Sequence, residues 1–511
     1  MTAESPAQPV GNRAAITVCV MLAALMQTLD TTIANIALPY MQGSVSASQD
    51  EIAWVLTSYL VAAAITTPTT GYLVGRFGLK RLYLVCVSGF IIASMLCGFA
   101  QSLVEIVLSR VLQGMFGAAL VPLAQSVMIT ISPPERRGQA MALFSMTILV
   151  GPVLGPIIGG WITENYNWRF IFFINLPIGL LALFGMMTFL KDTARVAAKL
   201  DWFGFGALGV AIAAFQILLD RGEELDWFGS GEIVIEAIVA ASALYLFLVH
   251  TFTARAPFVR PSLFRNRNYA AGALFGVIIG LTYYASLALQ PPYLQNLMGY
   301  PIVTAGLVLG PRGVGTIGAL AIVGRLVGRV DTRILLAVGL GLTAWAFWVM
   351  TGWTPDVSQG TVIGIGVVQG IGLGFLTVPV NVATLSSLSA EVRAEGAGFS
   401  TLLRNMGSSA GISIVNSLLT RNTQVNHSEI ASHVTSINRA FENPAIAQFW
   451  NPVTAAGRAA LDAVITQQAQ IIAYIDDYKL LMIATLAAAP LLIVFTKPSR
   501  DVAPDHTQAT E

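Results

Sequence analysis

Long stretches of this chain carry no charged side chain. Asp, Glu, Lys and Arg are absent from residues 31–49, 52–75, 82–104, 111–134, 138–163, 170–190, 268–311, 334–355 and 357–390. A transmembrane helix needs about 20 consecutive, mainly apolar residues. Only 11% of the chain is charged, whereas soluble domains contain about 25% charged residues. The sequence therefore predicts a multi-pass membrane protein and excludes a soluble multidomain enzyme.

The apolar runs divide into fourteen candidate helices. They cover roughly residues 14–38, 51–71, 82–101, 105–128, 139–162, 169–190, 203–220, 232–252, 269–290, 303–323, 333–353, 361–384, 397–420 and 478–496. The seventh and eighth give the weakest signal, because both are short and flanked by acids. A membrane β-barrel would need alternating polarity, but Gly89–Ala100 is apolar on all sides of a helix except at Ser94. We therefore expect an all-α integral membrane fold.

The connections between spans differ in charge. Basic residues cluster in alternate connections, at 76–81, 136–137, 191–199, 255–267, 325–333 and 497–500. The connections 39–50, 291–302 and 354–360 carry no Lys or Arg. Because basic loops stay in the cytoplasm, this alternation predicts an even number of spans with both termini cytoplasmic. The first span is too long for a signal peptide, and we expect it to be retained.

One acidic residue lies deep in the first apolar run. Asp30 shares a helical face with Gln27, Thr31 and Asn35, given the helical period. A carboxylate near the bilayer centre costs about 2.5–3.5 kcal/mol, so it faces a cavity or a partner. We expect the stripe to line a substrate cavity in which Asp30 gains and loses a proton. The alternative is a polar contact that fixes helix packing.

Arg110, in the fourth run, is the natural counter-charge for Asp30. An arginine at this depth must be paired or hydrated. Gln113 follows it on the same helical face and is assigned to the cavity. Gly114 and Gly117 permit close approach of another helix.

Further polar residues lie in the C-terminal spans. Arg312 and Arg404 are near span ends, where snorkelling to the interface is the preferred interpretation. Of these two positions, Arg404 with Asn405 is the better candidate to line a cavity. Tyr283 and Tyr284 can supply adaptable apolar and polar contacts there.

The fifth apolar run is rich in glycine and proline. It contains Gly151, Pro152, Gly155, Pro156, Gly159 and Gly160. Prolines kink a helix, and glycines four residues apart let another helix touch its backbone. The pattern predicts a bent, tightly packed helix that acts as a gate.

A glycine-rich basic connection follows the second run. It contains Gly71, Gly75, Arg76, Gly78, Lys80 and Arg81. The glycines allow a tight turn, and the basic residues hold it at the anionic cytoplasmic leaflet. A related pattern at Gly324–Asp331 indicates an internal duplication, as found in transporters.

The segment 421–477, between the last two spans, is polar. Ala455–Ala473 within it has the spacing of an amphipathic helix. We interpret the segment as a helical cap over the outer mouth or, alternatively, as a docking surface for a partner. His427 and His433 lack nearby carboxylates in a ligand pattern, so no metal site is expected.

These motifs resemble signature motifs of the major facilitator superfamily. The likeness rests on the 71–81 connection, on Arg110-Gln113-Gly114 and on the Gly/Pro-rich run. Leu29–Pro39 resembles the first-span motif of its 14-span drug:proton antiporter branch. Trp168–Gly179, Leu219–Phe228 and the 421–477 segment resemble the EmrB-type subgroup.

The resemblance implies two six-helix bundles plus two additional central spans. The corresponding boundaries are a tail at 1–13, a bundle at 14–190, a linker with the extra spans at 191–268, a bundle at 269–496 and a tail at 497–511. It also implies proton-driven export of hydrophobic drugs across a bacterial inner membrane, with Asp30 and Arg110 coupling the protons. The implied partners are an EmrA-type periplasmic adaptor and a TolC-type outer-membrane channel.

One position departs from the family pattern. The superfamily usually has an aspartate where this chain has Gly75. A charge relay through that acid is therefore not expected here. Arg76, Lys80 and Arg81 are expected to latch onto helix C-termini instead.

Other functions fit the sequence less well. A same-fold importer or metabolite exporter is the main alternative, because a fold does not fix a substrate. An intramembrane enzyme or receptor is not expected: His250, near a span end, is the single histidine of the spans, and there is no P-loop pattern. We expect no catalytic residue and no cofactor, with the proton gradient as the energy source. The net charge of +1 gives no support for nucleic-acid binding.

Overall fold

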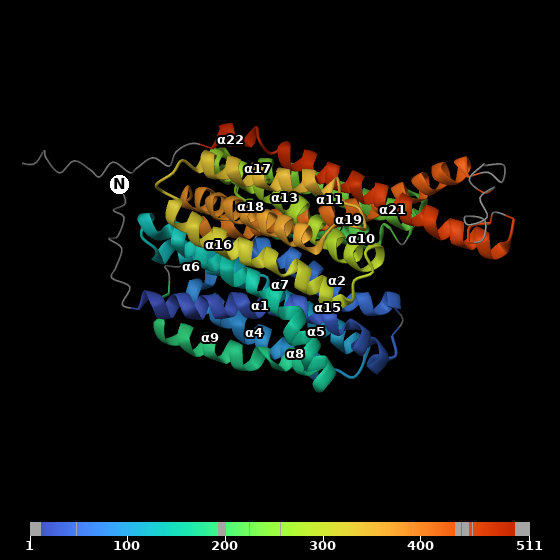
Figure 1. Cartoon of the computed structure of the whole chain (residues 1–511). Coiled ribbons are helices and arrows are strands. Elements are labelled where there is room, and N and C mark those ends of the chain that lie inside the picture. Colours follow the sequence, from blue (N-terminus) through green and yellow to red (C-terminus); the bar gives the residue numbers. More distant parts are fainter. Residues whose placement is uncertain are drawn as a thin grey trace, which may run out of the picture.

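The computed structural model describes residues 12–47, 49–192, 201–223, 225–255, 257–389, 391–434, 441, 449–451 and 453–495. Regular structure in these residues is helical, apart from one isolated bridge between Val327 and Val330. The helices lie side by side in an elongated bundle (Figure 1). We call the end at which Arg13 begins the first helix the N-terminal end, and the opposite end the far end. The predicted all-α fold is confirmed.

The N-terminal half comprises the helices before the gap at 193–200. Its elements are α1 (Arg13–Val45), α2 (Gln49–Thr66), η1 (Thr67–Thr69), α3 (Thr70–Phe77), α4 (Leu79–Phe99), α5 (Leu103–Gly117), α6 (Leu120–Ile131), η2 (Pro134–Arg136), α7 (Arg137–Asn165), α8 (Phe170–Phe173) and α9 (Asn175–Phe189). Two further helices follow, α10 (Trp202–Arg221) and α11 (Gly231–Thr253), with η3 (Trp227–Gly229) between them.

The C-terminal half begins after α11. Its elements are α12 (Ser262–Arg265), α13 (Arg267–Ile279), η4 (Gly280–Tyr284), α14 (Ala285–Pro292), η5 (Tyr293–Leu297), α15 (Ile302–Leu309), α16 (Pro311–Leu326), α17 (Thr332–Met350), α18 (Gln359–Ser386), α19 (Arg393–His433), α21 (Ala455–Leu486) and α22 (Leu491–Val494). The segments η4 and η5 are π-helical turns inside one long rod. Such turns accommodate an extra residue within a helix.

Eleven helical segments of the described chain are long and apolar enough to cross a membrane. They include the two predicted from the weakest signals, which form α10 and α11. The predicted spans 51–71, 139–162 and 397–420 are helical but are not among the eleven. The expected number of fourteen is therefore not confirmed.

The extra helices α10 and α11 pack on each other. Helix α10 also contacts α2 of the N-terminal half and α19 of the C-terminal half. A hydrogen bond from Ser413 Oγ to the Leu219 carbonyl (3.1 Å) fixes the second of these contacts. The α10–α11 pair therefore packs against the bundle at the boundary between the two halves.

The two halves are joined most closely at the N-terminal end. One buried apolar cluster there includes Val20 and Leu123 of the first half with Leu320 and Val378 of the second. At the far end, the buried clusters around Trp168 and Tyr293 draw on separate halves. The N-terminal end is therefore closed in this conformation.

Close backbone approach accounts for that closure. A Cβ atom on Gly138 of α7 would lie 2.7 Å from the carbonyl oxygen of Gly324 in α16. Arg393 of α19 adds a hydrogen bond from Nη1 to the Thr130 hydroxyl at 3.0 Å. Because both glycines lack a side chain, the two helices can touch.

The last two long helices confirm the predicted helix at Ala455–Ala473, which is the first part of α21, but they change the interpretation of segment 421–477 as a cap. Helix α19 continues to His433, well past the predicted span end at 420, and α21 begins at Ala455. The two extensions project from the far end as an antiparallel pair (Figure 1). His427 Nε2 and Asp462 Oδ1 lie 3.0 Å apart between them. We call residues 421–433 and 455–470 the far-end hairpin; it projects outward and is not a separate cap over the mouth.

Several predictions concern residues outside those described. The structure does not describe residues 1–11 of the N-terminal tail or any of the C-terminal tail 497–511. It also leaves out most of the basic connection 191–199 and, within the segment 421–477, residues 435–440 and 442–448. Pro152 and Pro156 lie in α7, but their side chains are not described, so the predicted kink stays a prediction.

Candidate functional site

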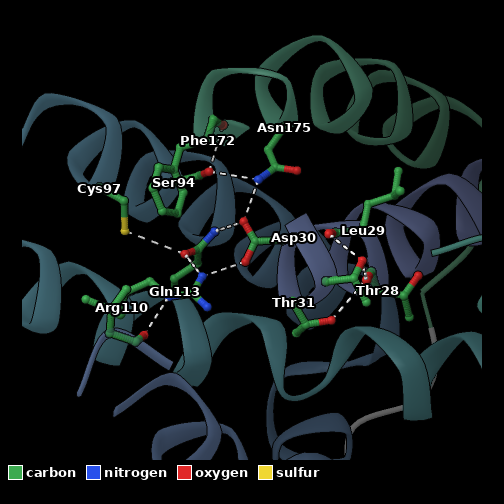
Figure 2. A network of polar contacts seen from close by, with 12 residues as sticks. Thr28, Leu29, Asp30, Thr31, Ser94, Cys97, Arg110, Gln113, Phe172 and Asn175 are labelled. Atoms are coloured by element: carbon green, nitrogen blue, oxygen red, sulfur yellow. Dashed lines mark hydrogen bonds and ion pairs between the residues drawn. The ribbon is translucent and has the colours of Figure 1, made fainter. Parts of the chain in front are cut away.

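Asp30 lies in the middle of α1 and is enclosed by protein. Its side chain accepts three hydrogen bonds from two other helices, α5 and α9 (Figure 2). Arg110 Nη1 donates to Oδ2 at 2.6 Å, while Gln113 Nε2 and Asn175 Nδ2 donate to Oδ1 at 2.7 and 2.8 Å. Asp30 is 2% exposed. We call these four residues the Asp30 network.

Arg110 is held on every side. Its Nε donates to the Val55 carbonyl (3.1 Å) and its Nη1 also contacts Gln113 Oε1 (2.8 Å). The guanidinium lies over the Tyr59 ring, 4.3 Å from the centroid. A buried ion pair is stable when further hydrogen bonds satisfy both groups, because removing the charges from water is costly. The structure meets that condition, and it pairs the two residues selected from the sequence.

Local sequence explains why α5 brings Arg110 to this depth. Ser102 caps the helix by accepting a hydrogen bond from the Glu105 amide at 3.3 Å. A Cβ on Gly114 would lie 2.5 Å from the Tyr59 carbonyl oxygen, so α5 packs directly on α2. Close packing of these helices places Tyr59 and Val55 against the guanidinium.

Asn175 is the member of the network that the sequence analysis missed. It begins α9, and its Nδ2 donates to both Asp30 and Ser94 Oγ (2.9 Å). Ser94 in turn donates to the Phe172 carbonyl at 2.9 Å. The available signal was a single amide inside the charge-free run 170–190. Such an amide needs a partner in the membrane interior.

The remaining members of the predicted stripe lie apart from the network. Gln27 and Thr31 are half-buried, and Asn35 is exposed. Thr31 donates back to the Thr28 carbonyl of its own helix (2.9 Å), and Gln27 Oε1 is buried without a hydrogen-bond partner. Gln113, which was assigned to the cavity, is fully buried in the network instead.

A second buried arginine contradicts the snorkelling interpretation. Arg312, in the first turn of α16, is only 4% exposed. It donates to Gln290 Oε1 (3.0 Å) and Ser286 Oγ (3.3 Å), and its guanidinium lies 4.7 Å from the centre of the Tyr283 ring. Polar partners inside the bundle satisfy the guanidinium, so its side chain turns inward.

Arg404 lines a cavity between the two halves, as one interpretation of the sequence proposed. The cavity, of about 20 Å³, is bounded by Gln125 of α6, Thr384 of α18 and Arg404 of α19. That volume is close to the room needed for one water molecule. Asn405 and Tyr284 are exposed, and Tyr283 stacks on Arg312. Only Arg404 of the predicted cavity residues bounds this cavity.

The glycine face of α7 packs against the helix that carries Asp30. A Cβ on Gly151 would lie 2.7 Å from Thr28, and one on Gly155 would overlap Thr32. Gly159 faces Ile33, whereas a Cβ on Gly160 would have no atom within 4 Å. The close approach predicted from the four-residue spacing is therefore confirmed for the first three glycines.

The 71–81 connection packs at the N-terminal end. Gly71 lies against Glu395 of α19, a Cβ on Gly75 would have no atom within 4 Å, and Gly78 has a φ of +87°. Lys80 Nζ donates to the Met187 carbonyl near the end of α9 at 2.6 Å. This contact has the geometry of the helix C-terminal latch expected for the basic residues.

A carboxylate from another part of the chain contacts this connection, although Gly75 stands where the superfamily usually has an aspartate. Asp192 Oδ1 accepts from the Lys80 amide at 3.2 Å, and its Oδ2 lies 3.8 Å from Arg81 Nε. Arg76 is exposed. No signal in the sequence pointed to Asp192, because this residue lies more than a hundred positions from the connection that it contacts.

Comparison with known proteins defines the class. The Major Facilitator Superfamily pattern matches residues 20–412. The chain is 37% identical to the fatty acid resistance protein FarB of Neisseria gonorrhoeae, over 82% of this chain and 83% of that protein. It is 36% identical to the multidrug export protein EmrB of Escherichia coli K12 (83% of each chain) and 32% identical to its probable multidrug resistance protein EmrY (98% of each).

A solved structure gives the same fold. The human organic anion transporter MFSD10 aligns with a TM-score of 0.59 at 15% identity, covering 94% of this chain and all of that chain. The protein is therefore a multi-pass membrane protein with a transporter fold. It belongs to the Major Facilitator Superfamily.

Proposed function

We propose that this protein is a proton-coupled antiporter that exports hydrophobic drugs by alternating access. The observation that carries the proposal is the Asp30 network, a buried carboxylate paired with Arg110 in the interior of the bundle. Relatives named for multidrug export support the direction of transport and the kind of substrate. The energy source in this proposal is the proton gradient, without a bound cofactor.

The network supplies a two-state element. A proton placed on Asp30 removes its negative charge and weakens the bonds from Arg110, Gln113 and Asn175. Those donors come from α5 and α9, whereas Asp30 lies on α1. Protonation therefore loosens α1 from its neighbours and, through the glycine face of α7, biases how the halves meet. Drug entry promotes loss of the proton and the opposite movement.

We assign drug binding to the space between the halves. Arg404 already faces a small cavity there, and opening of the N-terminal end would enlarge it. Gln27, Thr31, Asn35, Tyr283 and Asn405 are proposed to join the lining in that opened conformation. One elementary charge crossing about 100 mV is worth about 2.3 kcal/mol, enough for a roughly 50-fold gradient of a neutral drug.

The test uses Asp30→Asn in purified protein and in proteoliposomes. We expect loss of drug-driven proton release and at least a tenfold fall in proton-driven dye transport. Asp356→Asn, which removes an exposed carboxylate, is the matched control and should behave like the unaltered protein. Intact proton coupling in Asp30→Asn would disprove the proposal.

We further propose a bacterial inner-membrane location with both termini in the cytoplasm. Basic residues at the N-terminal end, such as Arg76, Lys80 and Arg393, support this orientation. The bundles are proposed to span 14–190 and 269–496. In that orientation the closed N-terminal end faces the cytoplasm and the far-end hairpin faces the periplasm.

The far-end hairpin is the proposed docking surface for an EmrA-type adaptor, which in turn would engage a TolC-type channel. Exposed Val425 and Val464 on its two helices support a protein contact. Shortening both helices by equal numbers of turns should abolish adaptor crosslinking while proteoliposome transport continues. Surviving crosslinks would place the docking surface elsewhere.

A further inference from the structure

Four aromatic rings pack against one another toward the far end of the C-terminal half. Tyr293 of η5 lies 5.2 Å from Tyr474 and 5.7 Å from Trp353, measured between ring centroids. The ring centroid of Tyr478 lies 5.9 Å from that of Trp353 and 6.5 Å from that of Tyr474, so each ring contacts two others. All four side chains are buried. We call them the aromatic ring cluster.

A second buried carboxyl sits beside this cluster. Asp477, between Tyr474 and Tyr478 on α21, is 1% exposed, and neither of its oxygens has a hydrogen-bond partner. The Tyr293 hydroxyl, the Trp353 indole nitrogen and the Tyr478 hydroxyl are likewise buried without a partner. An unpaired carboxylate in such surroundings is strongly disfavoured, whereas its protonated form is tolerated.

No described basic residue neutralises Asp477. The titratable groups around it are Asp476 and the two tyrosines of α21, Tyr293 of η5 and, beyond Tyr478, Arg312 of α16. Among the described residues of α17 and α19, which also pack on α21, none forms an ion pair with it. Asp30, by contrast, has Arg110 at 2.6 Å. The two acids therefore differ in how this conformation stabilises them.

A pocket lies next to this region, at the base of the far-end hairpin. It has a volume of about 400 Å³ and is lined by Asn296 of η5, Thr420 and Gln424 of α19, and Gln470 and Tyr474 of α21. Gln470, Tyr474 and Asp477 are spaced by four and three residues, so they share one face of α21. Tyr474 thus stands between the pocket and the buried carboxyl.

We propose that Asp477 is a second proton-binding site of the transporter, protonated in this conformation and exchanging its proton with the far end through the Tyr474 pocket. The step is a proton transfer only: a hydronium ion reaching the pocket gives its proton to a carboxylate oxygen and becomes water, and on release a water molecule takes the proton back as hydronium. The role of this proton in transport rests on the antiport proposed above, but its presence on Asp477 does not.

The experiment compares Asp477→Asn with Asp476→Asn. Asp476 is the adjacent acid, but it is partly exposed and lies 3.1 Å from Lys479 Nζ. Infrared spectra of the purified proteins at neutral pH should contain the carbonyl stretch of a protonated, desolvated carboxyl. We expect Asp477→Asn to lose the contribution of one such group and Asp476→Asn to retain it. In proteoliposomes, the ratio of protons to dye transported should fall only in Asp477→Asn.

Equal infrared bands in the unaltered protein and Asp477→Asn would overturn the inference, as would an unchanged proton-to-dye ratio. If Asp477→Asn fails to fold, Asp477→Glu serves instead, because it should shift the band without removing it; an unshifted band would count against Asp477. Failure of the proposed antiport would appear differently, as no proton movement with dye in the unaltered protein. The infrared comparison would still stand in that case.

Discussion

The hydroxyl of Thr32 donates a hydrogen bond of 3.0 Å to the backbone carbonyl of Gly151. This bond ties α1, two residues beyond Asp30, directly to the glycine-rich helix α7. It is possible because Gly151 and Gly155 present bare backbone to α1. A change of charge at Asp30 therefore acts on a helix that is already in backbone contact with α7, and α7 packs on α16 of the other half.

Replacing Gly155 by alanine should force α1 and α7 apart. The new methyl group would overlap Thr32 Oγ1, and overpacking of this kind costs about 1–3 kcal/mol. We expect a lower thermal unfolding midpoint in detergent and a several-fold loss of dye transport. Gly160→Ala is the control, since its methyl group meets open space. If both variants behave alike, the contact with α1 is not the reason for the glycine.

Replacing Arg110 by lysine should uncouple the Asp30 network although the charge is kept. Lysine lacks the planar fork that bonds Val55, Gln113 and Asp30 together. Leaving buried acceptors unpaired costs about 1–3 kcal/mol each. We expect at least a tenfold fall in proton-driven transport in proteoliposomes. Arg265→Lys, at an exposed position, should have no effect; unchanged transport in Arg110→Lys would rule out a specific pairing.

Replacing Asn175 by leucine should remove one donor from Asp30 and one from Ser94, which keeps its own hydrogen bond to the Phe172 carbonyl. The deprotonated form of Asp30 is then less well stabilised. We expect the pH dependence of dye transport to move toward higher pH, together with a loss of stability of about 1–3 kcal/mol. Gln359→Leu, at an exposed position in the first turn of α18, tests whether loss of any amide does the same. A pH profile that does not move would show that Asn175 only packs.

Replacing Glu395 by glutamine should stabilise the N-terminal end at neutral pH. Glu395 precedes the predicted span 397–420, and burial raises the pKa of its carboxyl, although the Arg260 amide and guanidinium partly offset this effect. A raised folded-state pKa means that stability is present at acid pH and is lost as pH rises through that pKa. Glutamine removes the buried charge and still accepts the Arg260 hydrogen bond.

The expected gain from Glu395→Gln is about 1 kcal/mol or less at neutral pH, measured as the thermal unfolding midpoint in detergent. The gain should vanish at acid pH, where the native side chain is itself protonated. A lower midpoint at neutral pH would mean that the ion pair with Arg260 outweighs the cost of burial. Glu391→Gln, at a nearby exposed position, is the control.

The sequence predicted the fold and the central ion pair because both depend on polarity at membrane depth. A charged residue within an apolar run is informative by itself, and Asp30 and Arg110 each had to find a partner. Asn175 and Asp192 were missed because their significance lies in which distant helix they face. Hydropathy also could not reveal the true lengths of α19 and α21, since a helix that leaves the membrane continues in polar sequence.

The prediction that the Arg312 side chain snorkels to the interface was wrong for a different reason. The position of Arg312 near a span end allowed either the interface or the interior, and the side-chain hydrogen bonds that link α14, α16 and α18 decide between them. Ser286, Gln290 and Gln369 together make an internal polar site. Ser286 and Gln290 lie on α14 and Gln369 lies on α18, and polar residues so far apart along the chain give no combined signal in one sequence.

The length of α19 has a mechanical consequence. Its 41 residues correspond to about 60 Å at 1.5 Å per residue, roughly twice the hydrocarbon thickness of a bilayer. A rigid rod of that length works as a lever: a small tilt where Arg393 joins Thr130 becomes a displacement of several ångströms at the tip near His433. In the transport cycle proposed above, movements around the transported molecule would thereby be carried beyond the lipid surface without any change of secondary structure.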